Sequence, residues 1–277
     1  MHHPGAKAWS FAIWADSAGA REIVRQMELR YMKRWGITGT TLLLSLIGVS
    51  ATAGAQSDRG QQNRGQPAHA QQPTAHPAPV PVAVQHQRVQ QQQQRVTQYK
   101  QHLTTQVPVV QKQTVQLQAQ KRTAQYHVQQ QYTTKLKQQQ QHLSTPRNYA
   151  SDPYVKAPST YRYVISGSAR ETNSYGVTML RQAVNDGYQQ GYLGGQADRK
   201  DHWKSDYQNS PAYLDANYGY TGNYIDQSDY NYYFRQGFQR GYEDAYGNHF
   251  QYGSSSNGTY SILANVLSSI LGLQPIG

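Results

Sequence analysis

Cysteine is absent from the 277-residue sequence. Its absence excludes disulfide-stapled scaffolds, zinc sites with cysteine ligands, catalysis by a thiol and a lipid anchor attached to cysteine. Charged residues make up only 15% of the chain, and the mean hydropathy of −0.82 excludes a polytopic membrane protein. HExxH, GxSxG, P-loop and dinucleotide-binding motifs are also missing. We therefore expect a protein that is not an enzyme and needs no cofactor.

A signal peptide is the clearest motif. From Met32 the chain reads MKRWGITGTTLLLSLIGVSATAGAQ, with two basic residues, an apolar run over 37–50 and a small-x-small cleavage site ending at Ala55. The run is short and rich in Gly and Thr for a membrane span, which favours a cleaved signal peptide. A retained anchor or a buried helix is the alternative. We expect cleavage of residues 32–55, which leaves no integral membrane span and a periplasmic or secreted bacterial protein. Residues 1–31 fit no part of a signal peptide and are expected to precede the true start.

Charge divides the remaining chain into two parts. Residues 56–150 contain eleven basic residues and one acidic residue, whereas residues 151–277 contain nine basic and eleven acidic residues. The composition of residues 56–84, rich in Pro, Gln and His, predicts a disordered linker. Residues 85–143 are rich in glutamine and carry an apolar residue every seven positions, which favours a basic, coiled-coil-like helical arm.

The apolar stripe of this arm is half as wide as a coiled coil needs, because companion positions such as Lys100 are polar. Pro108 is expected to kink or break the run at Val107, and we expect two long, marginal helices at about 85–106 and 109–143. A disordered glutamine tract is the alternative. The excess positive charge favours binding to a polyanion, such as envelope polysaccharide, lipopolysaccharide or extracellular DNA, without sequence-specific recognition of nucleic acid. The residues expected to contact it are Arg88, Arg95, Lys100, Lys112, Lys121, Arg122, Lys135 and Lys137.

An internal repeat marks the ordered part of the chain. AVNDGYQQGYLGGQAD at 183–198 aligns with YFRQGFQRGYEDAYGN at 233–248, at an offset of 50 residues. Small residues recur every four positions beside aromatic rows, which indicates two helices in close backbone contact; a flexible glycine loop is the alternative. We expect an αα-hairpin with pseudo-two-fold character and helices near 177–199 and 229–247. The residues predicted to line the helix contact are Ala183, Gly187, Gly191, Gly195, Gly237, Gly241 and Ala245.

These segments together predict a mainly α protein with a large disordered fraction. The repeat domain is expected over 176–252, after a linker at 144–175. An apolar stretch predicts a C-terminal helix at 259–273 that folds back on the hairpin. Docking of that helix on a membrane surface or a partner is the alternative.

Tyrosine, asparagine, aspartate and glycine crowd the loop at 203–233 between the two repeat helices. Flat rings stack on sugar faces, so carbohydrate or peptidoglycan binding is one interpretation of this loop. Packing of the same rings in the domain's own core is the other. The residues that would contact a sugar are Trp203, Tyr207, Tyr213, Tyr218, Tyr220 and Tyr224.

The same loop holds a weak calcium-binding pattern. Oxygen-bearing side chains recur at alternate positions of a twelve-residue frame, but Tyr220 stands where the turn needs glycine. The candidate ligands are Asp215, Asn217, Asn223 and Asp226. We do not expect this loop to hold a metal.

The signal peptide, the glutamine-rich arm and the stretches LRQAVNDGYQQGY and DQSDYNYYFRQGFQRGYEDAYG together resemble a group of uncharacterised exported bacterial proteins. The likeness covers roughly residues 90–250 and implies export and a shared architecture, but no activity. We predict an exported, non-catalytic envelope or extracellular interaction protein. Its arm would bind a polyanion, and its helical domain would form a homo-oligomer or dock a partner; carbohydrate binding through 203–233 is the alternative.

Overall fold

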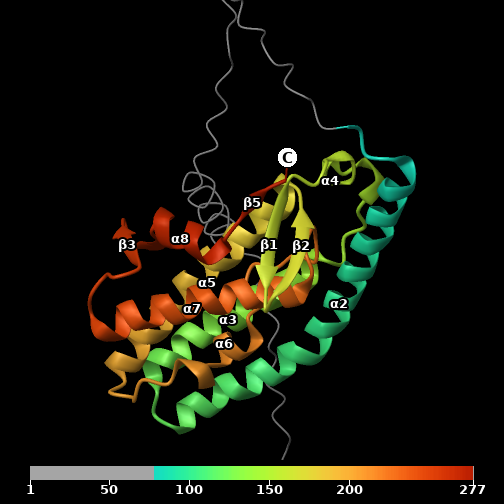
Figure 1. The fold of residues 1–277 in the computed structure, drawn as a ribbon. Coiled ribbons are helices and arrows are strands. Elements are labelled where there is room, and N and C mark those ends of the chain that lie inside the picture. The colour runs from blue at the N-terminus through green and yellow to red at the C-terminus, as the bar shows by residue number, and fades with distance from the viewer. Residues whose placement is uncertain (1–77, 277) are drawn as a thin grey trace, which may run out of the picture. The chain divides into compact units, whose positions relative to one another are not determined.

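The computed structural model describes residues 78–276, and within them the chain is mainly helical, as the sequence predicts (Figure 1). The signal peptide at 32–55, the extension at 1–31 and most of the linker at 56–84 lie outside the described residues, so these expectations remain predictions.

The glutamine-rich segment forms two long helices, α2 (Val82–Ala119) and α3 (Thr123–His142). They run antiparallel. Thr114 near the end of α2 lies beside Thr133 in α3, with 3.1 Å between their hydroxyl oxygens. Gln139, later in α3, donates from Nε2 to the hydroxyl of Tyr99, which lies earlier in α2, over 2.9 Å. The glutamine-rich part of the chain thus forms an antiparallel helix pair.

Helix α2 continues through Pro108, and the helical run is interrupted at residues 120–122 instead. The boundary predicted between helices at 85–106 and 109–143 is therefore wrong. Pro108 is exposed, and so is Thr104, whose carbonyl loses its helical partner, so water can hydrate that carbonyl on the outer side of the helix. At the observed break, Lys121 adopts a positive φ of 59° and lets the chain reverse.

The predicted linker at 144–175 is largely structured. It contains a 3₁₀ turn (Tyr149–Ser151), helix α4 (Pro153–Lys156) and strands β1 (Tyr161–Ile165) and β2 (Ser168–Thr172). The strands pair as a hairpin across Ser166 and Gly167, whose φ values of 50° and 80° suit a tight two-residue turn. Strand β5 (Gln274–Pro275) pairs antiparallel with the other edge of β1, so that the sheet order is β2-β1-β5.

The two repeat helices are α5 (Ser174–Lys200) and α7 (Gln227–Gly247). The segment at 201–226 connects them and contains a 3₁₀ turn (Tyr207–Asn209) and helix α6 (Pro211–Asp215). After α7 comes a second hairpin, β3 (Gly253–Ser256) and β4 (Thr259–Ile262), and then helix α8 (Ala264–Leu271). The C-terminal helix is thus shorter than the predicted 259–273, because its first residues pair as a strand.

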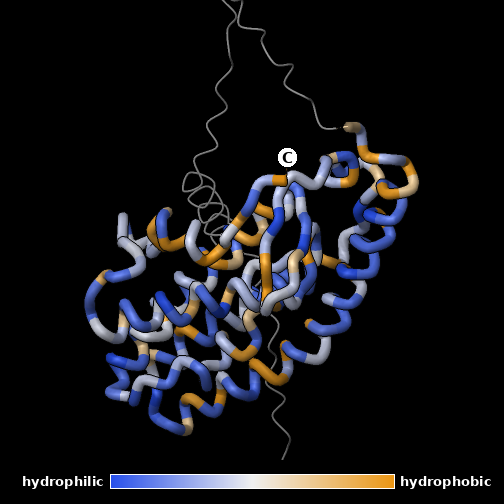
Figure 2. The backbone as a smooth tube through the Cα atoms, in the orientation of Figure 1, coloured by the Kyte–Doolittle hydropathy of each residue, from blue (hydrophilic) through white to orange (hydrophobic). Residues whose placement is uncertain are grey.

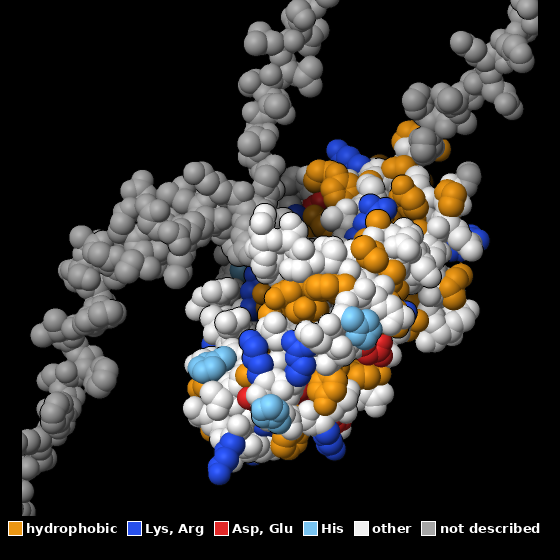
Figure 3. Space-filling model, turned by 90° about the vertical axis from the view of Figure 1, so that its left-hand side faces the viewer, with side chains coloured by type: hydrophobic (Ala, Val, Ile, Leu, Met, Phe, Trp, Pro, Cys, Tyr) orange, Lys and Arg blue, Asp and Glu red, His pale blue; other side chains and the backbone are white. Residues whose placement is uncertain are grey.

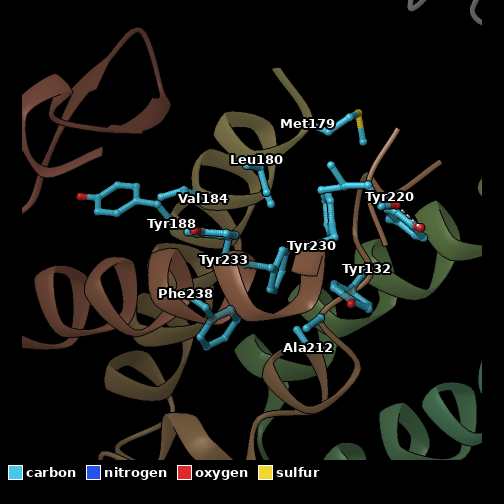
Figure 4. Packing of buried hydrophobic residues seen from close by; sticks show 14 of the residues in the cluster. Tyr132, Met179, Leu180, Val184, Tyr188, Ala212, Tyr220, Tyr230, Tyr233 and Phe238 are labelled. Atoms are coloured by element: carbon cyan, nitrogen blue, oxygen red, sulfur yellow. Dashed lines mark hydrogen bonds between the residues drawn. The ribbon is translucent and has the colours of Figure 1, made fainter. Parts of the chain in front are cut away.

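Tyrosine dominates the core. Figure 4 shows tyrosine rings from α3, α5, α7 and the 201–226 segment packed among aliphatic side chains. Strongly apolar positions are sparse along the described chain (Figure 2), so the rings supply much of the buried apolar area. Tyr99 and Leu103 of α2 and Tyr132 and Leu136 of α3 are fully buried in this same core. The segment predicted as a helical arm at 85–143 therefore packs on the repeat helices.

Candidate functional site

The small-residue rows bring α5 and α7 into backbone contact. A Cβ atom added at Gly187 would overlap the carbonyl oxygen of Phe234, and one added at Gly237 would overlap that of Val184. Gly191 and Gly241 are placed in the same way against Phe238 and Tyr188, and Gly195 lies against Tyr242. Ala183 and Ala245, at the ends of the rows, are buried. The Cα–H groups of these glycines thus point at carbonyl oxygens of the other helix, a contact that recurs where helices pack closely.

This register shows that α5 and α7 run parallel. Gly187, Gly191 and Gly195 meet carbonyls at positions that also rise along α7, from Phe234 to Tyr242. The pseudo-two-fold relation of the repeat is present, but the αα-hairpin expected from the sequence would be antiparallel. The segment at 201–226 runs back along the pair, so both helices begin at the same end of the domain.

Buried and half-buried aspartates receive hydrogen bonds from tyrosine hydroxyls throughout the domain. Across the helix pair, Tyr188 donates to Asp244 and Tyr242 donates to Asp198, each over 2.7 Å. The further pairs are Tyr132 with Asp215, Tyr163 with Asp229, Tyr224 with Asp152 and Tyr230 with Asp186. Burial, reinforced by the nearby carboxylate, raises the pKa of Tyr188 far above its ordinary value, so the hydroxyl stays a donor. These tyrosines therefore satisfy buried charge inside the protein.

The six residues considered for sugar binding do not form one surface. Tyr224 packs beside Tyr175 in the first turn of α5, whereas Trp203 follows the last turn of that helix. At 27 residues, α5 is about 40 Å long, at roughly 1.5 Å per residue. Tyr220 is buried in the core, and Tyr207, Tyr213 and Tyr218 pack against it, with Tyr207 and Tyr213 in edge contact. The loop rings thus serve mainly as core.

The calcium pattern is not assembled into a site. Asp215 accepts from the Tyr132 hydroxyl over 2.6 Å, and Asp226 pairs with Arg95 over 2.6 Å. Asn217 and Asn223 turn their side-chain amide nitrogens to oxygens within the 215–223 segment. Over residues 78–276 no group of three or more His, Cys, Asp or Glu side chains could hold a metal ion. Protein partners, arginine among them, thus take up the carboxylates that calcium would need.

The basic residues of α2 and α3 divide into two groups. Arg88, Arg95 and Arg122 turn inward: Arg88 donates to backbone carbonyls of α4, Arg95 pairs with Asp226, and Arg122 pairs with Asp198 over 2.5 Å. Lys135 lies over the Tyr218 ring, 5.9 Å from its centre. Lys100, Lys112, Lys121 and Lys137 are exposed, and none of them makes an ion pair within the described part of the chain. Of the basic residues at 82–142, only these four exposed lysines are therefore placed to meet an external polyanion.

A cavity of about 410 Å³ lies between α2, α4, the β1–β2 hairpin and the start of α7. Three guanidinium groups line it, those of Arg88, Arg95 and Arg170, together with the rings of Tyr154 and Tyr224. Arg170 and Tyr154 are not among the site residues predicted from the sequence, because no local spacing connects either residue with α2. The only signal was the lack of any acidic residue in α2, which left its arginines without partners on their own helix.

No protein-family model, curated protein or solved structure matches this chain. Among the helices within residues 78–276, none is both long enough and apolar enough to cross a membrane.

Proposed function

We propose that this protein is an exported, non-catalytic interaction protein that binds polyanionic polymers of the bacterial envelope or the extracellular space. The observation that carries the proposal is the charge of α2 and α3. Residues 82–142 contain eight lysines and arginines and no acidic residue. The signal-peptide pattern at 32–55 supports the location.

The four exposed lysines supply the contacts. A lysine ammonium is a compact, hydrated point charge, which suits the phosphate, sulfate or carboxylate groups of many polymers. Each neutralised phosphate of a polymer such as DNA releases a condensed counterion, so the association constant falls steeply as salt rises. Because such contacts go to the polymer backbone, they predict binding without sequence preference.

Further positive charge lies where α2 turns into α3. Arg199 and Lys200 end the neighbouring helix α5, and Lys204 follows them. Figure 3 views this side of the molecule, where Lys, Arg and His side chains outnumber acidic ones on the lower half. The acids nearby are partly occupied, since Asp201 accepts the backbone amides of Ala124 and Gln125 over 2.9 Å. Positive charge therefore continues from the turn at Lys121 onto the end of α5.

Binding of the secreted protein to random-sequence double-stranded DNA and to heparin, followed by fluorescence anisotropy from 50 to 200 mM salt, tests the proposal. Four phosphate contacts predict a loss of about a hundredfold in affinity over that range, since each contributes a slope of about −0.9. Replacing Lys100, Lys112, Lys121 and Lys137 with glutamine is expected to weaken binding at least tenfold at 50 mM salt and to flatten the salt dependence.

A matched control replaces Lys156, Arg162, Arg181 and Arg240 with glutamine, which removes the same charge elsewhere on the domain. The control is expected to bind within about threefold of the parent, because it leaves α2 and α3 intact. Equal losses in the two variants, or binding that does not respond to salt, would contradict the proposal.

A further inference from the structure

The arginine-lined cavity between α2, α4 and β2 is a second candidate binding site, apart from the exposed lysines. Arg88 and Arg95 reach it from α2, and Arg170 reaches it from β2. Tyr154 of α4 and Tyr224 of the 201–226 segment form its aromatic side, with ring centres 5.0 Å apart. The volume of about 410 Å³ lies within the range of small-molecule sites.

Three arginines and three acidic residues line this cavity, so the charge left over depends on how they pair. Asp226 accepts from Arg95 Nε over 2.6 Å, and Asp229 pairs with Arg170. The third acid of the lining, Glu171, pairs over 3.0 Å with Arg162 of β1, outside the cavity. Every carboxylate of the lining is thus matched by an arginine.

Arg88 is left without a carboxylate among the described residues. Its Nη1 donates to the carbonyl oxygens of Tyr154, Val155 and Ala157, and its Nη2 donates to Ser159 Oγ over 3.2 Å. These acceptors hold the guanidinium in place but carry no formal charge, so its positive charge remains uncompensated.

Arg95 also has a donor to spare. Its Nε is bonded to Asp226, but its Nη1 is buried and has no hydrogen-bond partner within residues 78–276. A buried guanidinium donor without an acceptor is unfavourable, and an oxyanion in the cavity would supply that acceptor.

The parallel arrangement of α5 and α7 adds to this field. Thr172 and Asn173 immediately precede α5, Ile225 and Asp226 immediately precede α7, and all four line the cavity. The positive ends of both helix dipoles therefore face the same space.

We infer that this cavity binds a small organic anion through a carboxylate or phosphate group held between Arg88 and Arg95, with the rest of the ligand against the rings of Tyr154 and Tyr224. The polymer surface of α2 and α3 takes no part in this site. The arginines of α2 and its exposed lysines thus serve two separate functions.

Isothermal titration of the secreted protein with inorganic phosphate and with citrate, at constant ionic strength in chloride, tests the assignment. Saturable binding of at least one anion is expected. Gln91 lines the cavity, so Gln91→Glu places a carboxylate beside the arginines and is expected to weaken anion binding at least tenfold. Gln93→Glu makes the same change at an exposed position of α2 and is expected to leave affinity within twofold.

Arg95→Lys is the second variant, because it keeps a cation for Asp226 and removes the free guanidinium donor. It is expected to weaken the anion at least fivefold, with an unchanged circular dichroism spectrum. The variant with four lysines replaced by glutamine is expected to bind phosphate and citrate normally, which separates this site from polymer binding. Absence of saturable binding, or equal effects of Gln91→Glu and Gln93→Glu, would overturn the assignment.

Discussion

The two helix pairs of this protein differ in which atoms form their interface, backbone atoms in one pair and side chains in the other. In α5 and α7 the backbones touch, because glycine leaves a carbonyl of the opposite helix where a Cβ would otherwise lie. In α2 and α3 side chains fill the interface, among them Leu103, Leu136 and the bonded hydroxyls of Thr114 and Thr133. A backbone contact cannot yield to an added atom, whereas interdigitated side chains can shift rotamers. The first pair is therefore expected to be far less tolerant of substitution.

Buried polar groups differ between the pairs as well. Across α5 and α7 the buried carboxylates of Asp198 and Asp244 accept hydrogen bonds from tyrosine hydroxyls. Within α2 and α3, buried amide atoms of Gln92, Gln125 and Gln129 have no hydrogen-bond partner in the described chain. The repeat helices thus satisfy their buried polar groups better than the glutamine-rich helices do.

The largest expected effect comes from closing the glycine contact. Gly191→Ala would drive a methyl group into the Phe238 carbonyl, which the rigid backbone of α7 cannot easily move aside. We expect a loss of about 3 kcal/mol or more in the free energy of unfolding, the upper end of the usual cost of overpacking. Urea denaturation followed by far-UV circular dichroism measures it.

Gly194→Ala is the matched control on the same helix. A Cβ at Gly194 would meet only side-chain atoms, the nearest being Cζ of Phe238 at 3.5 Å. Because alanine favours a helix interior over glycine, this change is expected to be neutral or to stabilise by up to about 1 kcal/mol. Similar losses for the two variants would show that α5 and α7 are not in backbone contact.

A smaller effect is expected at Asp186, whose carboxylate lies between Gln182 and Tyr230 on α5 and α7. Burial raises the pKa of Asp186 from 3.8 to about 6. The folded state thus binds the proton more tightly than the unfolded state, so stability falls as pH rises from 4 to 6 and stays lower above it. Asp186→Asn is expected to raise the free energy of unfolding by about 2 kcal/mol at pH 7.5 and by almost nothing at pH 4. A pKa shift of one unit corresponds to roughly 1.4 kcal/mol, and the partial exposure of Asp186 makes the expected gain smaller than the full shift would give.

Urea titrations at the two pH values give this difference directly. Glu171→Gln serves as the control, because its side chain is 52% exposed and pairs only at the surface. It is expected to change stability by less than about 0.5 kcal/mol at either pH. If Asp186→Asn were equally stabilising at pH 4 and 7.5, the ionised carboxylate would not be the cause.

The contact between the repeat helices was predictable because its signal is local. Small residues four positions apart share one helix face whatever the rest of the chain does. The direction of the pair was not predictable, since it depends on how the segment at 201–226 packs. The tyrosine–aspartate pairs were hidden for a similar reason: Tyr188 and Asp244 lie 56 residues apart and meet only through the register of the two helices.

The β3–β4 hairpin had a signal in the sequence, but the composition of its strands obscured it. Asn257 and Gly258 form a dipeptide typical of a two-residue hairpin turn, and their φ values of 50° and 73° match it. The serine-rich flanks lack the apolar alternation that usually marks strands, so the segment was predicted as the start of a helix. The cavity between Arg88 and Arg170 had no signal beyond the lack of acidic residues in α2, because it is formed by segments that only the tertiary fold brings together.

The smallest expected effect tests the glutamine-rich pair. Gln129 of α3 is fully buried, and neither its Nε2 nor its Oε1 has a hydrogen-bond partner within residues 78–276. Gln129→Leu removes both polar atoms while roughly keeping the volume, so we expect stabilisation by about 1 kcal/mol. Gln130→Leu, at the exposed neighbouring position, is expected to stay within about 0.5 kcal/mol in the same urea assay. A loss of stability at Gln129 would mean that its amide is bonded in solution, and the two helix pairs would then satisfy their buried polar groups equally well.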